Sequence, residues 1–179
     1  MRPFRFCPQC GSSLSQPDEN DKIHCSACGR IWYHNAAPTA GCVIVRDGRA
    51  LVTVRARDPE KGRCDIPGGF LNHDEDPISG VKREVKEELG LDVEVGARDF
   101  VQAVPHRYGD DGDWVLALGF VARSAAGDPE PADDVAEIKW VTADEAEALD
   151  FAWPHDRDLV LAALRSDPDP RTGRSDGPS

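Results

Sequence analysis

The residues best suited to do chemistry are three glutamates in one short segment, Glu84, Glu87 and Glu88. In an α-helix, positions i, i+3 and i+4 lie on one face, so these carboxylates would point the same way. Like charges at this spacing destabilise a bare helix by about 0.2–0.5 kcal/mol per pair. Bound Mg²⁺, which takes oxygen ligands, would offset the repulsion, and a solvated acidic face is the alternative explanation. The three glutamates alone leave both interpretations open.

Four of the six cysteines form a second set, with the spacing of metal ligands. They occur as two Cys-x-x-Cys pairs, Cys7/Cys10 and Cys25/Cys28, each followed by a glycine. Two intervening residues let both thiolates of a pair reach one ion, and the glycine permits the positive φ that such a turn needs. Four thiolates suit a closed tetrahedral Zn²⁺ site. We therefore predict a small four-cysteine zinc ribbon over residues 1–35.

A structural or subunit-contact role is favoured for this ribbon, with nucleic-acid binding as the alternative. A module of about 30 residues cannot bury enough core to fold alone, so the metal supplies folding free energy. Its charged residues are of both signs, whereas nucleic-acid binding needs clustered cations: Asp18, Glu19, Asp21, Lys22 and Arg30. We therefore expect no nucleic-acid partner, and a homodimer is one assembly that the module could support.

The composition is that of a globular protein without a membrane partner. The chain has 179 residues, of which 40% are hydrophobic and 30% charged, and its net charge is −12. An anionic substrate is not excluded, because bound divalent cations invert the local charge. No apolar run approaches the roughly 18 residues of a membrane span, and the N-terminus leads directly into Cys7 without a signal-peptide stretch. We therefore expect a cytoplasmic location.

The glutamates need a helix to position them, and local signals define one over residues 77–89. Asp76 suits the N-cap, Pro77 the first helical position and Gly90 the C-terminal stop. Apolar residues recur at spacings of three and four, which predicts one buried stripe: Ile78, Val81, Val85 and Leu89. This helix would present the three carboxylates beside the stripe.

The rest of the chain mixes strands and helices without a regular βαβ alternation, which favours an α+β fold with a mixed sheet flanked by helices. Strands are expected at 39–45, 51–55, 93–95, 100–104, 114–121 and 138–141, and further helices at 142–149 and about 154–165. Asp47-Gly48 predicts a hairpin turn. Residues 36–38 are expected to link the ribbon to a domain over 36–165, followed by a disordered tail over 166–179. Cys42 and Cys64 are interpreted as small buried residues rather than nucleophiles.

The segment around the predicted helix resembles the Nudix box. Read from Gly69, the chain runs through Glu75 and then Arg83-Glu84-Val85-Lys86-Glu87-Glu88-Leu89-Gly90-Leu91, which fits the box at every fixed position. The resemblance extends over roughly residues 36–165. It implies a Nudix fold, in which a mixed β-sheet is sandwiched between helices, and a metal-dependent pyrophosphohydrolase that uses Mg²⁺ or Mn²⁺.

The same resemblance assigns roles to five residues of the box. Glu87 and Glu88 would bind the catalytic cations, and Glu84 would be a further ligand or the base that activates water. Glu75 would support the site, and Arg83 would orient a catalytic carboxylate through an ion pair. Which glutamate acts as the base stays open.

Candidate residues also lie outside the helix. The backbone at Gly68 and Gly69 would run close to metal and phosphate. Glu137, shortly before Trp140, is either another ligand or base or a surface carboxylate at a strand edge. Tyr108 and His106 could contact the non-phosphate part of a substrate or could be ordinary loop residues.

Substrate hints conflict. A zinc ribbon before such a domain is similar to the arrangement in NADH pyrophosphatases, but the segment 101–108 lacks their specificity sequence. Within the family, the position of Pro105 is linked with ADP-ribose and that of Tyr108 with dinucleoside polyphosphates. We expect hydrolysis of a nucleoside diphosphate linked to another moiety, ADP-ribose-like or a related dinucleotide, with release of AMP. Alternatives are house-cleaning hydrolysis of nucleoside triphosphates, action on RNA 5′ ends, and a non-catalytic nucleotide sensor.

Overall fold

The computed structural model describes residues 5–109 and 112–166, and the chain forms two compact units. One unit comprises Met1–Ala37 together with Pro105–Val115, and the other comprises Pro38–Val104 and Leu116–Ser179. The tail predicted to be disordered lies outside the described residues except for Ser166, which follows the last helix.

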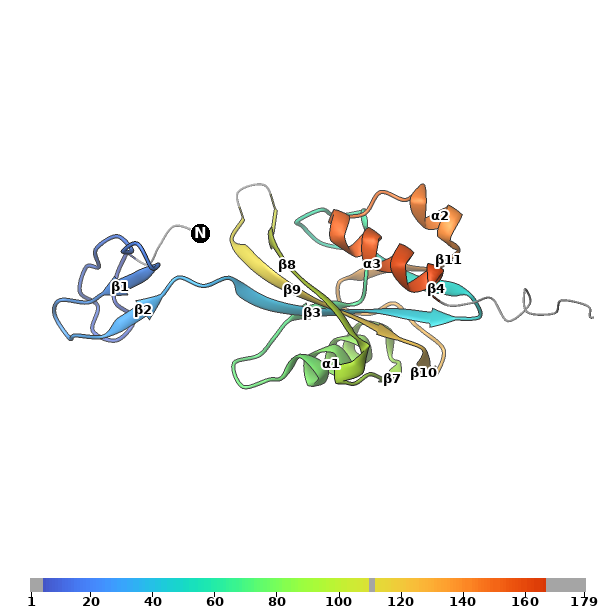
Figure 1. Cartoon of the computed structure of the whole chain (residues 1–179), viewed down its shortest axis with the longest axis horizontal. Helices are drawn as coiled ribbons and strands as arrows, with labels where there is room; N and C mark the ends of the chain where they lie inside the picture. The colour runs from blue at the N-terminus through green and yellow to red at the C-terminus, as the bar shows by residue number, and fades with distance from the viewer. Residues whose placement is uncertain (1–4, 110–111, 167–179) are drawn as a thin grey trace, which may run out of the picture. The chain divides into compact units, whose positions relative to one another are not determined.

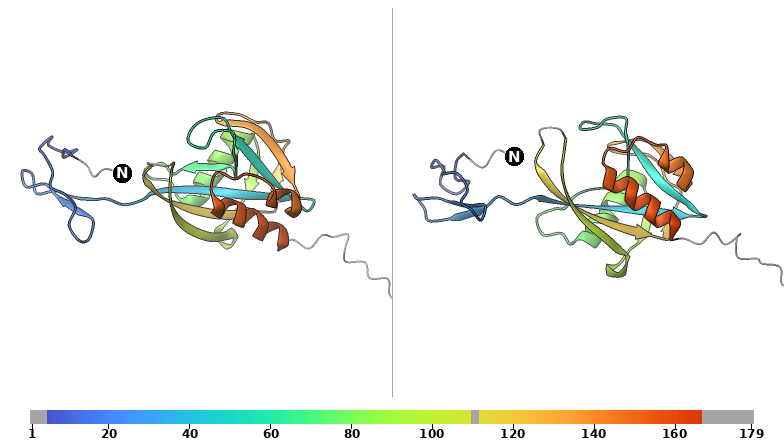
Figure 2. Two further views of the ribbon diagram at one scale, coloured as in Figure 1. Left: turned by 90° about the horizontal axis from the view of Figure 1, so that it is seen from above. Right: turned by 45° about the horizontal axis from the view of Figure 1, so that its top comes forward.

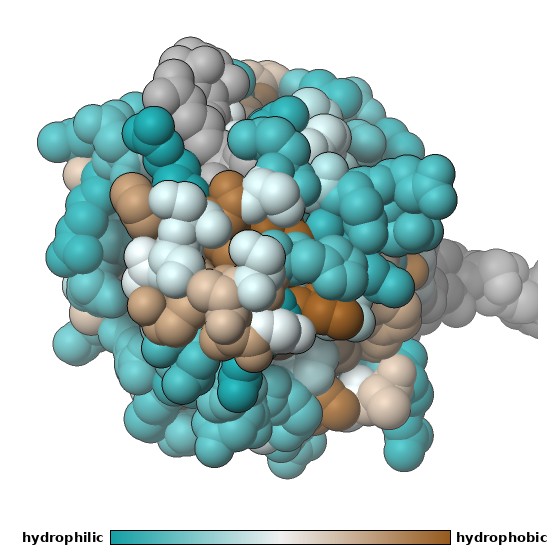
Figure 3. Space-filling model, turned by 90° about the vertical axis from the view of Figure 1, so that its left-hand side faces the viewer, coloured by the Kyte–Doolittle hydropathy of each residue, from teal (hydrophilic) through white to brown (hydrophobic). Residues whose placement is uncertain are grey.

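The N-terminal unit contains a two-stranded antiparallel sheet, β1 (Lys22–His24) and β2 (Ile31–Tyr33), in which Lys22 pairs with Tyr33. Ile23 is fully buried. Gly11 and Gly29 both adopt φ of 73°, as their place after each Cys-x-x-Cys pair predicts. Their N–H groups donate to the carbonyls of Cys7 and Cys25 at 2.9 and 2.8 Å, which closes two similar turns. The face of the molecule in Figure 3 shows apolar residues interspersed among polar ones.

The second unit is built on a mixed sheet with strand order β11-β4-β3-β9-β8; β5 pairs with β4, and β6 pairs with β3. The strands are β3 (Ala37–Arg46), β4 (Arg49–Arg55), β5 (Cys64–Asp65), β6 (Gly68–Phe70), β8 (Phe100–Arg107), β9 (Trp114–Ala122) and β11 (Val135–Val141). A separate antiparallel pair joins β7 (Asp92–Glu94) to β10 (Ser124–Ala126), and η1 (Ala97–Asp99) precedes β8. The predicted Asp47-Gly48 turn is confirmed: both residues have positive φ, 53° and 70°, and Val45 pairs with Ala50.

Helices cover both faces of this sheet (Figures 1 and 2). Helix α1 (Pro77–Leu89) lies on one face, and α2 (Ala143–Glu147) and α3 (Pro154–Arg165) lie on the other. Val81, Val85 and Leu89 are fully buried in the cluster on the α1 side, and Ile78 packs against it. Burying each such side chain contributes about 1.5–3 kcal/mol. The predicted α+β sandwich and its three helices are therefore confirmed.

Two local features differ from the expectation. The predicted link at 36–38 overlaps strand β3, which begins at Ala37; Pro38 lacks an N–H, but its carbonyl accepts from Leu71 N at 3.1 Å. The short strands β1, β2, β5 and β10 lie outside the strands predicted from the sequence, because two or three residues carry too little alternation to be recognised. Within the described residues, no helix is long and apolar enough to cross a membrane.

Candidate active site on helix α1

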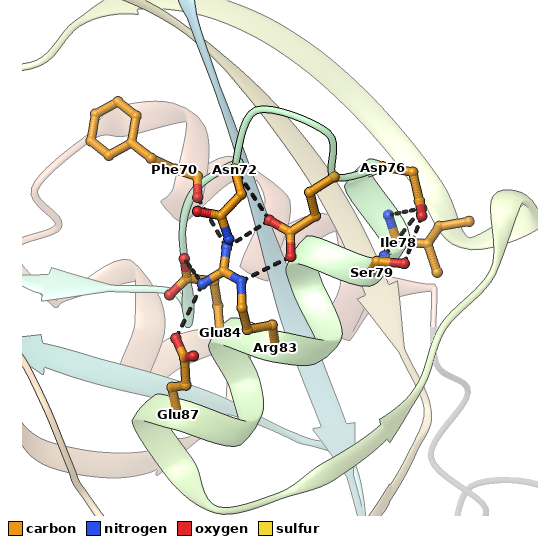
Figure 4. A network of polar contacts seen from close by, with 9 residues as sticks. Phe70, Asn72, Asp76, Ile78, Ser79, Arg83, Glu84 and Glu87 are labelled. Atoms are coloured by element: carbon orange, nitrogen blue, oxygen red, sulfur yellow. Dashed lines mark hydrogen bonds and ion pairs between the residues drawn. The ribbon is translucent and has the colours of Figure 1, made fainter.

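The ends of α1 are fixed by local hydrogen bonds, so the positions of its side chains are well defined. Asp76 Oδ1 accepts from the N–H groups of Ile78 and Ser79 at 2.9 and 3.1 Å, and Pro77 occupies the first turn. At the other end Gly90 adopts φ of 69°, and its N–H donates to Lys86 O at 3.0 Å. The predicted caps and the boundaries 77–89 are confirmed. Figure 4 shows the N-cap beside the charged network of the site.

Arg83 is the centre of that network. Its Nε and Nη2 donate to the two oxygens of Glu75, both at 2.8 Å, and Nη2 also donates to Phe70 O at 3.1 Å. Its Nη1 reaches Glu84 Oε1 at 2.7 Å and Glu87 Oε2 at 3.1 Å. The guanidinium of Arg83, together with Asn72 N–H, lowers the pKa of Glu75 to about 2, so Glu75 is firmly ionised. The Arg83 guanidinium thus orients three carboxylates, those of Glu75, Glu84 and Glu87.

Glu88 is the most buried of the glutamates, with 6% of its surface exposed. Its Oε2 accepts from Gly68 N–H at 3.0 Å. Burial, reinforced by the negative charge of Asp134, raises its pKa to about 9. Burial likewise raises the pKa of Glu84, against the opposing effect of Arg83. Glu84 and Glu88 are buried without enough positive charge around them, which favours the binding of a divalent cation. They therefore fit the Mg²⁺ or Mn²⁺ that the Nudix box implies. The side chain of Glu87 is 53% exposed.

The glycines before the helix are required by close packing. Strand β6 pairs with β3 so that Gly68 lies opposite Gly41 and Gly69 opposite Ala40. A Cβ on Gly68 would overlap Gly41 Cα and lie 2.5 Å from Ala40 O. A Cβ on Gly69 would lie 2.5 Å from Glu84 Oε1. Because neither residue has a side chain, Gly69 lies directly against Glu84, and Gly68 N–H reaches Glu88.

Asp134 lies near the glutamates of α1, and no local motif in the sequence points to it. The loop that carries it is held to the end of α1, because Ala132 N donates to Glu88 O at 2.8 Å and Glu130 N to Leu89 O at 3.1 Å. The charge of Asp134 raises the pKa of both Glu88 and Glu84, so its carboxylate is close enough to act on both. Its only signal in the sequence is an Asp-Asp pair just before a strand. Asp134 is thus a further candidate to bind a cation.

The structure does not bring Glu137 into this network. It lies on β11 opposite Val54, its side chain is 59% exposed, and its Oε2 is 3.6 Å from Lys139 Nζ. These surroundings favour the surface-carboxylate interpretation. His106 and Tyr108 fall in Pro105–Val115, which belongs to the N-terminal unit. Their contacts with a substrate stay predictions.

The four predicted zinc ligands come together in the N-terminal unit. Their Sγ atoms all lie within 4.8 Å of one another, with Cys7–Cys28 at 3.8 Å and Cys10–Cys25 at 3.6 Å. Tetrahedral Zn²⁺ with bonds near 2.3 Å would separate its sulfurs by about 3.8 Å, so the set fits zinc. Among the described residues this is the group whose ligand atoms converge on one point. The α1 glutamates do not converge in this way among the described residues; Glu84 and Glu87 instead contact Arg83 Nη1.

Cys42 and Cys64 are buried, as expected, with 0% and 5% of their surfaces exposed. Burial raises the pKa of the Cys42 thiol to about 12, and burial also raises that of Cys64. Because only the thiolate is a good nucleophile, neither residue is suited to covalent catalysis.

Comparison with known proteins identifies the family. The NUDIX domain profile matches residues 36–163, and the chain belongs to this family of hydrolases. It is 34% identical over 136 residues to a MutT-like protein of Streptomyces ambofaciens, covering 69% of this chain and 82% of that protein. It is 30% identical over 122 residues to the ADP-ribose pyrophosphatase of Methanocaldococcus jannaschii, covering 68% of this chain and 70% of that protein.

A longer relative and a solved structure extend the comparison. The chain is 30% identical over 146 residues to the NAD-capped RNA hydrolase NudC of Chromobacterium violaceum, covering 81% of this chain and 52% of that protein. It therefore spans about half the length of that relative. The crystal structure of a NUDIX hydrolase from Nitrosomonas europaea matches with a TM-score of 0.71 at 22% identity, covering 96% of this chain and 94% of that one. The Nudix fold is thereby confirmed.

Proposed function

We propose that this protein hydrolyses the pyrophosphate bond of a nucleoside diphosphate linked to another group, with ADP-ribose-like compounds or related dinucleotides as substrates. The observation that carries the proposal is the buried Glu88 carboxylate, held by Gly68 N–H beside a Glu84 and a Glu87 that Arg83 orients. The products would be a nucleoside monophosphate, AMP for an adenosine substrate, and a phosphorylated remainder.

Mg²⁺ or Mn²⁺ bound by Glu84, Glu87 and Glu88 would neutralise phosphate charge and lower the pKa of a bound water. The chain's own groups prepare that chemistry. The Glu75–Arg83 pair keeps the carboxylates in fixed positions, and the Gly68–Gly69 backbone lies directly against Glu84 and Glu88. Water oxygen forms a bond to phosphorus as the bridging P–O bond breaks, and one glutamate takes the proton from water.

The names of the relatives support this substrate class. Two of them, the ADP-ribose pyrophosphatase and the NAD-capped RNA hydrolase, are named for substrates in which a pyrophosphate joins adenosine to a second group. The second name also keeps hydrolysis at RNA 5′ ends as an alternative. With a net charge of −12, however, the chain is poorly suited to long contacts with RNA. The MutT-like relative leaves house-cleaning of nucleoside triphosphates as the other alternative.

A sensor without catalysis is the least favoured alternative. A protein that only binds a nucleotide does not need a buried Glu88 next to Glu84 with no positive group to balance their charge. Ionising these carboxyls lowers the stability of the fold in the absence of a cation. For the N-terminal unit, we propose that Cys7, Cys10, Cys25 and Cys28 hold one structural Zn²⁺ that is required for its folding.

A substrate panel tests the enzymatic proposal. ADP-ribose, NADH, diadenosine polyphosphates, nucleoside triphosphates and a short NAD-capped RNA would be incubated with zinc-loaded protein and Mg²⁺ or Mn²⁺. AMP release from at least one adenosine diphosphate derivative is expected, and the double variant Glu87→Gln/Glu88→Gln should lose it. Glu94→Gln, at an exposed carboxylate of β7, is the matched control. No turnover by the wild type, or full activity in the double variant, would contradict the proposal.

A further inference from the structure

A buried ion pair joins the last residue of β4 to β5. The side chains of Arg55 and Asp65 are 11% and 12% exposed, and Arg55 Nη1 donates to Asp65 Oδ2 at 2.7 Å. Arg55 Nε also donates to Pro59 O at 2.8 Å, and the guanidinium carbon lies 4.8 Å from the centre of the Trp153 ring. Neither residue of the pair belongs to the Nudix box. The guanidinium is thus held by three different groups, and it holds the Asp65 carboxylate in turn.

The Asp65 side of the pair leads along the backbone to the glutamates of α1. Asp65 Oδ1 accepts from the N–H of the next residue at 2.8 Å, which ties the side chain to its own strand. Pro67 O then accepts from Cys42 N at 2.9 Å, and Gly68 N–H donates to Glu88 Oε2 at 3.0 Å. Three residues therefore separate the carboxylate that Arg55 holds from the amide that holds Glu88.

The Arg55 side of the pair leads to a second segment that contacts Glu88. Strand β4 pairs with β11 at Arg55, and the next amide, Ala56 N, donates to Asp134 O at 2.7 Å. The loop before β11 is bonded to the end of α1, because Ala132 N donates to Glu88 O at 2.8 Å. The pair thus joins the two segments that hydrogen-bond to the side chain and to the backbone of Glu88.

From these contacts we propose that Arg55 and Asp65 are positioning residues for the glutamate site. Their ion pair fixes the segment that presents Gly68 N–H to Glu88 relative to the loop that docks on α1. Neither residue touches substrate or cation in this role, and both act through Glu88. A buried ion pair often stabilises a fold no more than apolar residues of similar volume do, so a positioning role and a stabilising role can be separated by experiment. The inference rests on the proposed function only where it concerns turnover and cation binding.

Removing both charges separates the two roles. Arg55→Met alone leaves the Asp65 carboxylate buried without its cation, which should lower the melting temperature. In Arg55→Met/Asp65→Leu neither charge remains, so the melting temperature should recover toward that of wild type. The hydrogen bond between β4 and β5 side chains is still missing, and we expect kcat on the best substrate of the panel to stay about tenfold or more below wild type. Arg49→Met is the matched control: Arg49 lies on the same strand in an exposed ion pair, and kcat should stay within about twofold of wild type.

Amide hydrogen exchange tests the positioning role without substrate or divalent cation. In zinc-loaded protein, the Gly68 N–H should exchange about tenfold faster in the double variant than in wild type, because the segment that carries it is less firmly placed against Glu88. The N–H of Val85, which is fully buried on α1, reports global unfolding and serves as the internal reference. Mn²⁺ affinity, measured by isothermal titration calorimetry, should fall in the same variant.

The outcomes distinguish the inference from the proposed function. A double variant whose kcat recovers together with its melting temperature would show that the pair only stabilises the fold. Gly68 exchange that is unchanged relative to Val85 would also overturn the inference. If the double variant does not fold, Arg55→Lys decides, because lysine keeps the charge but cannot reach Asp65 and Pro59 O together. Faster Gly68 exchange and lower kcat in Arg55→Lys would support positioning, and wild-type values of both would overturn it. Absence of turnover in the wild type would instead count against the proposed function, and the exchange measurement would still stand.

Discussion

Arg83 and Glu75 form a two-point ion pair, in which Nε and Nη2 each donate to a different carboxylate oxygen at 2.8 Å (Figure 4). The same guanidinium uses Nη1 for Glu84 and Glu87. Glu75 therefore fixes the plane of the guanidinium, and the guanidinium in turn fixes the carboxylates that we propose as cation ligands. We therefore expect both the geometry and the charge of the Arg83 guanidinium to be needed.

Replacing Arg83 by lysine tests whether the planar geometry of the guanidinium is needed for activity. The lysine ammonium keeps the charge but cannot make two parallel hydrogen bonds to Glu75 while also reaching Glu84. We expect kcat of Arg83→Lys to fall by about 10- to 100-fold, with a folded, zinc-loaded protein. Steady-state kinetics on the best substrate of the panel would measure this, with the exposed neighbour Lys82→Gln as control. A kcat unchanged in Arg83→Lys would show that charge alone suffices.

The low pKa of Glu75 predicts a specific acid sensitivity. Its folded pKa of about 2 lies below the ordinary value of 4.5, so the Arg83 contact stabilises the fold above pH 4.5 and is lost as pH falls toward 2. Glu75→Gln should therefore be less stable than wild type at neutral pH, and the two should converge across that window. Chemical unfolding at several pH values would measure the difference. A constant difference down to pH 2 would contradict the assignment.

The local parts of this architecture could be predicted from the sequence, and the long-range contacts could not. The bounds of α1 follow from Asp76, Pro77 and Gly90, because capping depends on residues close by in the sequence. The resemblance to the Nudix box then identifies the candidate glutamates on this helix. Asp134 reaches the same site only because the loop before β11 docks on the end of α1. The ion pair of Arg55 with Asp65, at 2.7 Å, likewise depends on the pairing of β4 with β5. No periodicity or local spacing encodes such contacts.

Glycine at position 69 is predicted to be essential for the site rather than for the fold. In Gly69→Ala the new methyl group would meet Glu84 Oε1 at 2.5 Å, and the carboxylate would have to move. We expect a loss of kcat of about 10- to 100-fold with a modest change in melting temperature. Gly96→Ala is the control, because its Cβ would lie 3.8 Å from the nearest atom, Asp99 Oδ2, an ordinary contact. Equal activity of the two variants would contradict the close approach of β6 to Glu84.

The raised pKa of Glu88 predicts opposite effects of Glu88→Gln on stability and on metal response. In wild type without divalent cation, stability falls as pH rises from about 4.5 toward 9, because the folded state keeps a proton that the unfolded chain releases. The glutamine does not titrate and leaves Oε1 to accept from Gly68 N–H, so the variant should be more stable than wild type at pH 8. Adding Mg²⁺ or Mn²⁺ should raise the melting temperature of wild type and leave that of Glu88→Gln nearly unchanged, since a ligand stabilises only the form that binds it. Differential scanning fluorimetry with and without the cation gives both results, with Glu94→Gln as the control. A Glu88→Gln variant that responds to the cation as wild type does would remove Glu88 from the proposed cation site.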